Sequence, residues 1–585
     1  GYTCGDLFFQ QTLLTSALNG LETILKELKQ EDIICIVGLP IRVETNLYNC
    51  AAVCYHGRLL GIVPKTNLVD QGGLNETRYF CTAPDYREIM LCNQTVPFGT
   101  NIIFSCDTLT EFQFGVEICN DIWVTEPPSN VLAKEGATVI FNLSASTEVV
   151  GRAAYRKTLV TGQSAKLICA YVYADAGEGE STTDYVYSGH DLIAENGTIL
   201  AESPLFYTGF IDADIDLQLL WQERCHTSCW NHVSTPSYQK VRFSLPIISL
   251  QLERTIQANP FLPPRLPDLP ARCESILNIQ ANGLKNRLAH IGCRHVVIGL
   301  SGGLDSTLAL LATVRAFEAM QLDPSGITAV SMPCFGTTNR TRLNARSLAI
   351  ELGCTFREID ISASVTQHFH DIGQDPNQHD VTYENAQARE RTQVLMDIAN
   401  QLGGIVIGTG DLSESALGWA TYNGDHMSMY GVNAGVPKTL IRYLVDYEAK
   451  RTNNDILKKT LQDILDTPVS PELLPPKDGK ISQKTEHIVG PYELHDFFLY
   501  HLMRFGSKPS KILRLAEVAF DGIYDREVIL EWLKVFYRRF FAQQFKRSCL
   551  PDGPKVGSVA LSPRGDWRMP SDASYQIWAK ELETL

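Results

Sequence analysis

The sequence predicts an α/β protein of two or three domains whose second part is a doubly wound parallel sheet. Its 585 residues are too many for a single hydrophobic core. Short apolar runs rich in β-branched residues alternate with helical runs, which is the pattern of strand–helix–strand units. A proline-rich segment at residues 259–270 can continue neither a helix nor a central strand and separates two such series. We therefore expect domains at residues 1–225 and 271–585, joined by a linker region at 226–270.

Buried strands are predicted wherever a short apolar run is bounded by turn residues. In the second part each such run is followed by a helical run, so the strands should lie parallel with their carboxyl ends at one edge of the sheet. A ligand site is expected at that edge. The predicted strands are residues 33–37, 51–55 and 139–141 in the first part, and 296–300, 328–331 and 404–407 in the second.

The chain is acidic, with 51 Lys and Arg against 66 Asp and Glu and a formal net charge of −15. Binding to nucleic acid or to an anionic membrane needs clustered cations, so we expect neither partner. No apolar stretch is long enough to span a bilayer, and no signal peptide is visible. The 16 cysteines have no framework spacing, which predicts reduced thiols in a cytoplasmic protein.

Two pairs of cysteines are spaced C-x-x-x-C, and histidines flank the second pair. A metal site there is the less favoured interpretation, because the usual C-x-x-C spacing and a second matching pair are absent. The residues concerned are Cys50 and Cys54, then Cys225 and Cys229 with His226 and His232.

The most informative run is VVIGLSGGLDS at residues 296–306. An apolar strand ends in a glycine-rich turn, and an apolar helical run follows at once. Such a turn lets backbone N–H groups surround a phosphate at a helix start. Gly302 and Gly303 allow close approach of the backbone, and Asp305 beside a phosphate is best explained as a Mg²⁺ ligand. The glycine and lysine spacing of a Walker loop is absent.

The run S-G-G-x-D-S resembles the PP-loop of N-type ATP pyrophosphatases, which adenylate a substrate and release pyrophosphate. The alternative is an ordinary strand–helix turn with two glycines, and it is disfavoured because every position of the motif is filled. The resemblance implies that ATP is bound by the whole loop, Gly299, Leu300, Ser301, Gly302, Gly303, Leu304, Asp305 and Ser306.

Later motifs suggest what is adenylated. The strand at residues 404–407 runs into a turn that carries Thr409 and Glu414, and Asp425 follows in Asn-Gly-Asp. Glu414 and Asp425 near strand ends could share Mg²⁺ with Asp305, and Lys438 at a predicted helix start could bind phosphate. Taken singly, Glu414 is equally a first-turn helix acid and Lys438 a surface lysine.

Together and in this order, these motifs resemble the NAD synthetase family, which converts deamido-NAD to NAD. Residues 383–391 resemble the family's segment that grips deamido-NAD, and residues 490–499 and 561–567 resemble its long, glutamine-dependent branch, whose members form octamers. A long loop at residues 467–487 is a candidate lid. The resemblance implies Mg²⁺ ligands at Asp305, Glu414 and Asp425, and further ATP contacts at Met332, Thr409 and Ser470. It implies deamido-NAD contacts at Asn385, Arg389, Glu414, Trp419, Tyr422, Lys438 and Lys546.

In the first part, Cys119 ends an apolar strand and Lys65 follows another. A cysteine is a thiolate near neutral pH only with help, which an adjacent ammonium supplies. Alone, Cys119 is a buried structural thiol and Lys65 a solvated lysine. With Glu76 they resemble the nitrilase/amidase superfamily, an αββα sandwich. The resemblance implies that Cys119 is the nucleophile, that Lys65 stabilises the oxyanion, and that Glu76 orients or assists. Ser146 and Arg152 match the residues that hold the α-amino and α-carboxylate groups of glutamine.

One member of that superfamily's set is not found. Its first catalytic glutamate lies in a Pro-Glu-Leu-like motif shortly before a Gly-Tyr pair, and this chain starts at Gly1-Tyr2 rather than at Met. The general base, and the superfamily's first strand, helix and strand, are therefore expected upstream of Gly1. The chain as given should then use ammonium but hydrolyse glutamine poorly, since general-base catalysis is typically worth ~10²–10⁴-fold.

The expected function is ATP-dependent amidation of deamido-NAD with ammonia from glutamine. The resemblance to the long branch of the family implies that the chain forms a homo-oligomer, an octamer. Other PP-loop enzymes are the alternatives. GMP and asparagine synthetases pair the loop with different glutaminases, and a tRNA thiolase should carry a basic surface. A non-catalytic scaffold or an ammonia-only synthetase also remains, and is distinguished by comparing glutamine with ammonium as the nitrogen source.

Overall fold

The protein is described here from a computed structural model, which covers residues 2–71, 74–84, 86–180, 184–227, 230, 238–467, 473–474 and 486–585. The chain divides into two compact units, Gly1–Arg254 and Thr255–Leu585. The division falls inside the region expected as a linker, 226–270. The predicted lid loop, 467–487, lies almost entirely outside the described residues, and so does Ser470. Each unit is described by itself.

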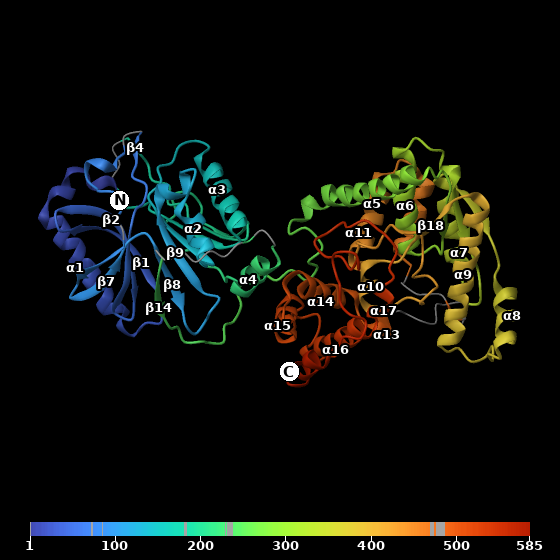
Figure 1. The fold of residues 1–585 in the computed structure, drawn as a ribbon. Coiled ribbons are helices and arrows are strands. Elements are labelled where there is room, and N and C mark those ends of the chain that lie inside the picture. The colour runs from blue at the N-terminus through green and yellow to red at the C-terminus, as the bar shows by residue number, and fades with distance from the viewer. Residues whose placement is uncertain are drawn as a thin grey trace. The chain divides into compact units, whose positions relative to one another are not determined.

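The first unit is built on two sheets, one of five strands in the order β1-β2-β3-β7-β6 and one of seven in the order β13-β12-β11-β10-β9-β8-β14 (Figure 1). A two-stranded ribbon, β4-β5, accompanies them. The strands are β1 Cys35–Val43, β2 Asn46–Tyr55, β3 Arg58–Pro64, β4 Asp70–Gln71, β5 Leu74–Asn75, β6 Arg87–Leu91, β7 Gln94–Phe98, β8 Ile102–Cys106, β9 Gln113–Ile118, β10 Val139–Ser144, β11 Ala170–Asp175, β12 Leu192–Glu195, β13 Thr198–Glu202 and β14 Gln239–Phe243.

Helices cover the outer faces of both sheets, so the predicted αββα sandwich is confirmed. Between the sheets, Val53 of β2 packs in one core with Phe104 of β8 and Val116 of β9. Leu21 of α1 (Gln11–Glu27) belongs to the core on the outside of the five-stranded sheet. Val160 of α3 (Arg152–Leu167) belongs to that of the seven-stranded sheet, together with residues of α2 (Pro128–Lys134). Strands with two covered faces bury nearly every residue, which explains the continuous apolar runs.

The three strands predicted in this unit exist as β1, β2 and β10, and each is longer than its apolar run. Residues 33–34 precede β1, and Ile33 is exposed. The runs mark only part of each strand, and in β1 the buried residues, Leu39 and Ile41, lie beyond the run. Polar residues at the strand ends, such as Asn46 and Ser144, also pair in the ladders through their backbones, and an apolar pattern does not detect them.

The second unit contains a five-stranded sheet in the order β17-β16-β15-β18-β19, in which every pairing is parallel. The chain passes from β15 outward to β17 and then returns to place β18 on the other side of β15. This reversal opens a crevice at the carboxyl ends of β15 and β18, where such sheets bind ligands. The predicted doubly wound sheet is confirmed. The strands are β15 Val296–Gly299, β16 Ile327–Ser331, β17 Thr355–Glu358, β18 Ile405–Gly408 and β19 Tyr430–Gly431.

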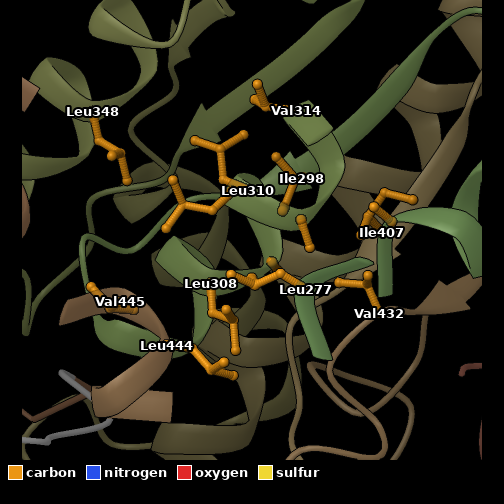
Figure 2. Packing of buried hydrophobic residues seen from close by; sticks show 14 of the residues in the cluster. Leu277, Ile298, Leu308, Leu310, Val314, Leu348, Ile407, Val432, Leu444 and Val445 are labelled. Carbon is orange, nitrogen blue, oxygen red and sulfur yellow. The ribbon is translucent and has the colours of Figure 1, made fainter. Parts of the chain in front are cut away.

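The helix that follows the glycine-rich turn, α6 (Leu304–Ala319), is buried along most of its surface. Figure 2 shows Leu308 and Leu310 of this helix among side chains of the surrounding strands and helices. Their cluster includes Ile298 of β15 and Leu444 of α11. Truncating one buried leucine in such a core typically costs ~2–5 kcal/mol. This packing fixes the helix start, and with it the turn.

The other helices of this unit cover the sheet and continue into a helical C-terminal region, in which α14 and α16 pack against the short helix α10. None of the described helices is long and apolar enough to cross a membrane. The bounds are α5 Leu269–Ile291, α7 Asn339–Glu351, α8 Ser362–Ile372, α9 Val381–Leu402, α10 Leu412–Leu417, α11 Lys438–Arg451, α12 Asp455–Leu465, α13 Glu486–Val489, α14 Tyr492–Phe505, α15 Pro509–Ala519, α16 Arg526–Ala542, α17 Gln544–Arg547 and α18 Gln576–Glu583; α4 of the first unit is Leu217–His226.

Candidate active sites

Cys119 stands at the end of β9, where the strand turns into a short 3-10 helix, Cys119–Trp123. Its φ is +50°, a left-handed conformation that is costly for a residue with a side chain. Asn142 of β10 holds this turn, because its Oδ1 accepts a hydrogen bond from the Cys119 N–H at 3.0 Å and its Nδ2 donates to the Cys119 carbonyl at 3.3 Å. Strain that neighbours hold in place at a strand end points to a functional side chain.

Lys65 follows β3 and is almost completely buried, with 1% of its surface exposed. Its Nζ lies 2.5 Å from Oε2 of the equally buried Glu76. That carboxylate also accepts hydrogen bonds from the Val69 N–H at 2.8 Å and from Asn49 Nδ2 at 3.1 Å. Lys65 is therefore no solvated lysine. It is one half of a fully buried ion pair whose carboxylate is held by further donors.

Asp121 connects the segment after Lys65 to the cysteine turn. Its Oδ1 accepts hydrogen bonds from the N–H and Nδ2 of Asn67 at 2.8 and 2.9 Å, and its Oδ2 accepts one from the Ile118 N–H at 3.0 Å. Burial raises the pKa of Asp121, while its backbone and side-chain donors and the nearby charge of Lys65 act in the opposite direction. Asp121 was not among the residues predicted from the sequence, although it stands two positions after Cys119.

The segment expected to bind glutamine runs beside the nucleophile. Cys119 Sγ lies 3.9 Å from the Ala145 carbonyl oxygen. The next residue, Ser146, donates its N–H to Asp175 Oδ1 at 2.8 Å and receives a hydrogen bond at Oγ from the buried Arg156, at 3.2 Å. Burial raises the pKa of Asp175 to about 6, against the pull of its hydrogen-bond donors and of Arg156. Ser146 is thereby held close to Cys119.

Arg152, the second expected glutamine contact, begins α3. Its Nη1 donates to Thr147 Oγ1 at 3.2 Å, and its guanidinium carbon lies 5.1 Å from the centroid of the Trp123 ring. Trp123 closes the 3-10 turn that Cys119 opens. Arg152 therefore lies against the 3-10 turn that Cys119 begins, while Ser146 follows the residue that Cys119 Sγ approaches.

In the second unit, the glycine-rich turn has the geometry that the sequence requires. Gly302 has φ +82°, and a Cβ at this position would clash with the carbonyl oxygen of Thr341. Ser301 Oγ accepts a hydrogen bond from the Gly303 N–H at 3.1 Å, and Thr307 Oγ1 donates to the Gly303 carbonyl at 2.8 Å. These bonds hold the turn against the first residues of α6, where free N–H groups favour an anion.

Three carboxylates converge beside this turn. Asp305, Asp411 and Glu414 each offer an oxygen, and these oxygens lie within 4.8 Å of one another. Lys438, the first residue of α11, sits among them with its Nζ at 2.9, 2.6 and 2.9 Å from the three side chains in that order. Carboxylate oxygens are the ligands that Mg²⁺ prefers, so the donor set fits this ion, and one ammonium leaves two negative charges uncompensated.

The charges shift one another's protonation. Burial alone would lower the pKa of Lys438, but the carboxylates hold it well above its ordinary value. Burial raises the pKa of Glu414 to about 7, against the attraction of Lys438. Burial and the charge of Glu414 raise the pKa of Asp411 well above its usual range. Proximity of like charges at low solvent exposure is typical of functional sites.

Asp425, predicted as the third metal ligand, is not part of this cluster. Its Oδ1 accepts a hydrogen bond from the Thr421 N–H at 2.8 Å within its own loop. The third carboxylate of the cluster is Asp411, which was not among the residues predicted from the sequence. A signal was available, because Asp411 and Glu414 form a D-x-x-E capping box at the start of α10.

Most residues expected to bind deamido-NAD gather around the loop after α10. Asn385 Oδ1 accepts a hydrogen bond from Thr421 Oγ1 at 2.7 Å, and Arg389 Nε donates to the Tyr422 carbonyl at 3.3 Å. Lys546 of α17 donates to the Gly418 and Ala420 carbonyls at 2.7 and 2.6 Å. The Arg539 guanidinium lies over the Trp419 ring, with its central carbon 5.3 Å from the ring centroid. Glu414 and Lys438 belong instead to the carboxylate cluster.

Two further ATP candidates lie near the ends of β16 and β18. Met332 is buried just after β16. The Thr409 carbonyl accepts a hydrogen bond from Asn433 Nδ2 at 3.1 Å, and the same nitrogen donates to the Asp305 carbonyl at 2.9 Å. Ser470 lies outside the described residues, as do Cys229 and His232. His226 Nε2 lies 3.0 Å from the side-chain nitrogen of Gln222.

Comparison with known proteins assigns both units. The carbon-nitrogen hydrolase family model matches residues 1–223, and the NAD synthase model matches residues 276–523. The chain is 41% identical over 618 residues to the glutamine-dependent NAD(+) synthetase of Mycobacterium tuberculosis, covering 100% of this chain and 91% of that protein. It is 27% identical to that of Thermotoga maritima, covering 97% and 90%. A solved synthetase from Cytophaga hutchinsonii aligns over 100% and 91% with 21% identity and a TM-score of 0.46.

The two matched models follow each other in the order expected from the motifs, with the hydrolase model over the Cys119 unit and the synthase model over the PP-loop unit. The other PP-loop enzymes considered above are thereby excluded. The chain belongs to the glutamine-dependent NAD(+) synthetases, ATP-using carbon–nitrogen ligases in which a glutaminase domain precedes an NAD synthetase domain.

Proposed function

We propose that the two strand-end sites carry out the two halves of the family's reaction in this chain. The observation that supports the proposal is that each unit has a site of the required kind. The first unit has the strained Cys119 turn and the buried Lys65–Glu76 ion pair. The second unit has the PP-loop and the carboxylate cluster beside it. The first unit releases ammonia from glutamine. The second uses ATP to activate deamido-NAD, which ammonia converts to NAD.

In the first unit, Cys119 attacks the side-chain amide carbon of glutamine and forms a thioester as ammonia leaves. Lys65 stabilises the oxyanion of the tetrahedral intermediate, since a buried ammonium acts strongly where water is excluded. Glu76 orients Lys65 through the 2.5 Å contact. Ser146 and Arg152 bind the α-amino and α-carboxylate groups of the substrate.

In the second unit, the backbone N–H groups of the PP-loop and Lys438 bind the ATP phosphates, with Met332 and Thr409 at the nucleotide. Asn385, Arg389, Trp419, Tyr422 and Lys546 orient deamido-NAD, so that its carboxylate faces the α-phosphorus. Displacement of pyrophosphate gives an acyl-adenylate, and ammonia then displaces AMP. Bound Mg²⁺, held by Asp305 and Glu414, would neutralise charge on the pyrophosphate leaving group.

The assembly is also part of the proposal. We infer a homo-oligomer, an octamer by resemblance to the long branch of the family, in a compartment where thiols stay reduced. The fifteen described cysteines are all free, which supports the second point. Light scattering coupled to size exclusion tests the assembly, and a monomer at micromolar concentration would contradict it.

The decisive experiment compares nitrogen sources. Cys119→Ala should eliminate NAD synthesis from glutamine and leave synthesis from ammonium largely intact, because the nucleophile acts only in the first unit. The matched control is Cys81→Ala, which removes an exposed thiol of the same unit and should change neither rate. An equal loss with both nitrogen sources would show that Cys119 is a structural thiol.

A further inference from the structure

Asp411 is the least exposed member of the carboxylate cluster. Its side chain is 0% exposed, whereas those of Asp305 and Glu414 are 26% and 21% exposed. Its Oδ1 accepts the Glu414 N–H at 2.8 Å and caps α10, while its Oδ2 lies 2.6 Å from Lys438 Nζ. Asp305 and Glu414 can therefore reach a bound ligand, but Asp411 faces only the helix end and the lysine.

The backbone around Lys438 is fixed by hydrogen bonds at the start of α11. The Lys438 N–H donates to Ser413 Oγ at 2.8 Å, and the next residue, Thr439, donates its N–H and Oγ1 to Asp496 at 3.0 and 2.7 Å. The start of α11 is thereby fastened to its neighbours. The Lys438 ammonium can form an ion pair with any of the three carboxylates, and its shortest contact is the one to Asp411.

We propose that Asp411 is a positioning residue that takes Lys438 as its ion-pair partner and so leaves Asp305 and Glu414 available for a divalent cation. This inference rests on the proposed function of the second unit and names a residue which that function does not use. The charges support it. When all three carboxylates are ionised, they and the one ammonium carry a net −2, which matches one divalent ion, and the Asp411–Lys438 ion pair is neutral by itself.

Without the Asp411 charge, the ammonium has only Asp305 and Glu414 as partners. Lys438 then competes with the cation for its ligands, and the cluster retains a net charge of only −1. Both effects weaken cation binding. Asparagine is the informative replacement, because its side-chain oxygen still caps α10 as well as aspartate does while the charge is lost.

The test measures binding of Mn²⁺ alone to the full chain, from the electron paramagnetic resonance signal of the free ion. Asp411→Asn should weaken binding about tenfold, as expected for losing one charge a few ångströms away. Lys438→Met should tighten it. The double variant should bind at least as tightly as the original protein, because the competing ammonium is gone and the net charge is again −2.

The double variant separates positioning from mere support of the fold. If Asp411 only stabilised α10, Lys438→Met would tighten binding by the same factor with and without the Asp411 charge, and such additive effects would overturn the proposal. Positioning requires a larger factor in the Asp411→Asn background, where the ammonium competes for both remaining carboxylates. Asp380→Asn is the matched control, because Asp380 caps α9 through the Thr382 and Tyr383 N–H groups outside the cluster. It should leave the Mn²⁺ affinity within about twofold.

Asp305→Asn distinguishes this inference from the proposed function on which it rests. Mn²⁺ binding that survives Asp305→Asn would mean that the cluster is not the cation site, and the proposed function would fail. Binding that is lost in Asp305→Asn but unchanged in Asp411→Asn would overturn the positioning role alone. Thermal unfolding of each variant checks that the fold is retained.

Discussion

The two candidate sites both lie at the carboxyl ends of strands, but their charges are arranged in opposite ways. In the first unit, one buried ammonium, Lys65, faces one buried carboxylate, Glu76. In the second, one ammonium, Lys438, faces three carboxylates. The first pair is balanced without a ligand. The second cluster carries an excess of negative charge that a cation must compensate.

This difference reflects the two kinds of chemistry. In the proposed reaction the first site supplies its own nucleophile, and burial of the Lys65–Glu76 pair holds the ammonium in position before glutamine arrives. In the proposed reaction the second site binds ATP, and an excess of carboxylates there can bind the divalent cation that accompanies the nucleotide. Partial exposure of Asp305 and Glu414 allows that binding.

The largest effect is expected from a substitution in the second site. Asp305→Asn should abolish NAD formation from either nitrogen source, since losing a charged ligand at a Mg²⁺–phosphate site costs several kcal/mol of transition-state stabilisation, roughly 10³-fold or more. The measurement is initial NAD formation with ammonium and with glutamine. The control is Asp323→Asn, an exposed aspartate that caps a short 3-10 turn. Near-normal turnover in Asp305→Asn would refute the PP-loop assignment.

The next largest effect is expected from a substitution in the first site, and only with glutamine as the nitrogen source. Lys65→Met should lower glutamine-supported synthesis by roughly 10²–10³-fold, which is typical of losing one oxyanion donor, and leave the ammonium-supported rate nearly unchanged. Lys157→Met is the control, because Lys157 forms a partly exposed ion pair with Glu202 and such pairs contribute little. Equal activity of Lys65→Met and the original chain with glutamine would exclude Lys65 from the chemistry.

A smaller effect concerns the loop backbone. Gly302→Ala places a Cβ against the Thr341 carbonyl at φ +82°, so the loop must move and ATP binding should weaken about tenfold or more, visible as a raised KM for ATP with both nitrogen sources. Gly292→Ala is matched, because Gly292 also has a positive φ, +64°, but open space around its Cβ position. It should cost only ~1–2 kcal/mol of stability. Identical KM values in the two variants would contradict the steric argument.

The smallest effect concerns buried charge beneath the first site. Burial raises the pKa of Glu117 to about 7, although its contacts with Tyr171 and Ser129 favour the ionised form. Because this folded pKa exceeds the unfolded one, the folded chain binds the proton more tightly, and stability should decrease as pH rises from about 4.5 to 7, by at most ~1.4 kcal/mol per pH unit. Glu117→Gln should flatten this dependence in urea unfolding at pH 5, 6, 7 and 8. An unchanged slope would mean that other groups cause it.

Much of both sites was predictable because the signals are local. The turn at residues 301–306 follows an apolar strand and precedes an apolar helix, and Gly302 is needed there for steric reasons that act within a few residues. Cys119 likewise ends a recognisable strand. Lys438 was expected at a helix start and is the first residue of α11.

The third carboxylate was not predictable in the same way. Asp411 and Asp425 both follow β18, and a carboxylate has the same chemistry at either position. The capping box at the start of α10 directs Asp411 toward Lys438, whereas a backbone hydrogen bond holds Asp425 in its own loop. Which of them meets Asp305 depends on how α6, α10 and α11 pack together.

The sequence by itself determined the two units, the strand–turn–helix segments and the candidate reactive groups, because glycine conformation, apolar periodicity and side-chain chemistry are properties of short segments. Only the tertiary structure decided which charges become partners. Lys438 meets Asp305 across 133 residues of chain, and Asp121 links the segment after Lys65 to the turn at Cys119 across 54. Such pairings arise from packing in a medium of low dielectric constant, where distance and burial set their strength, and neither quantity is encoded in the spacing of residues along the chain.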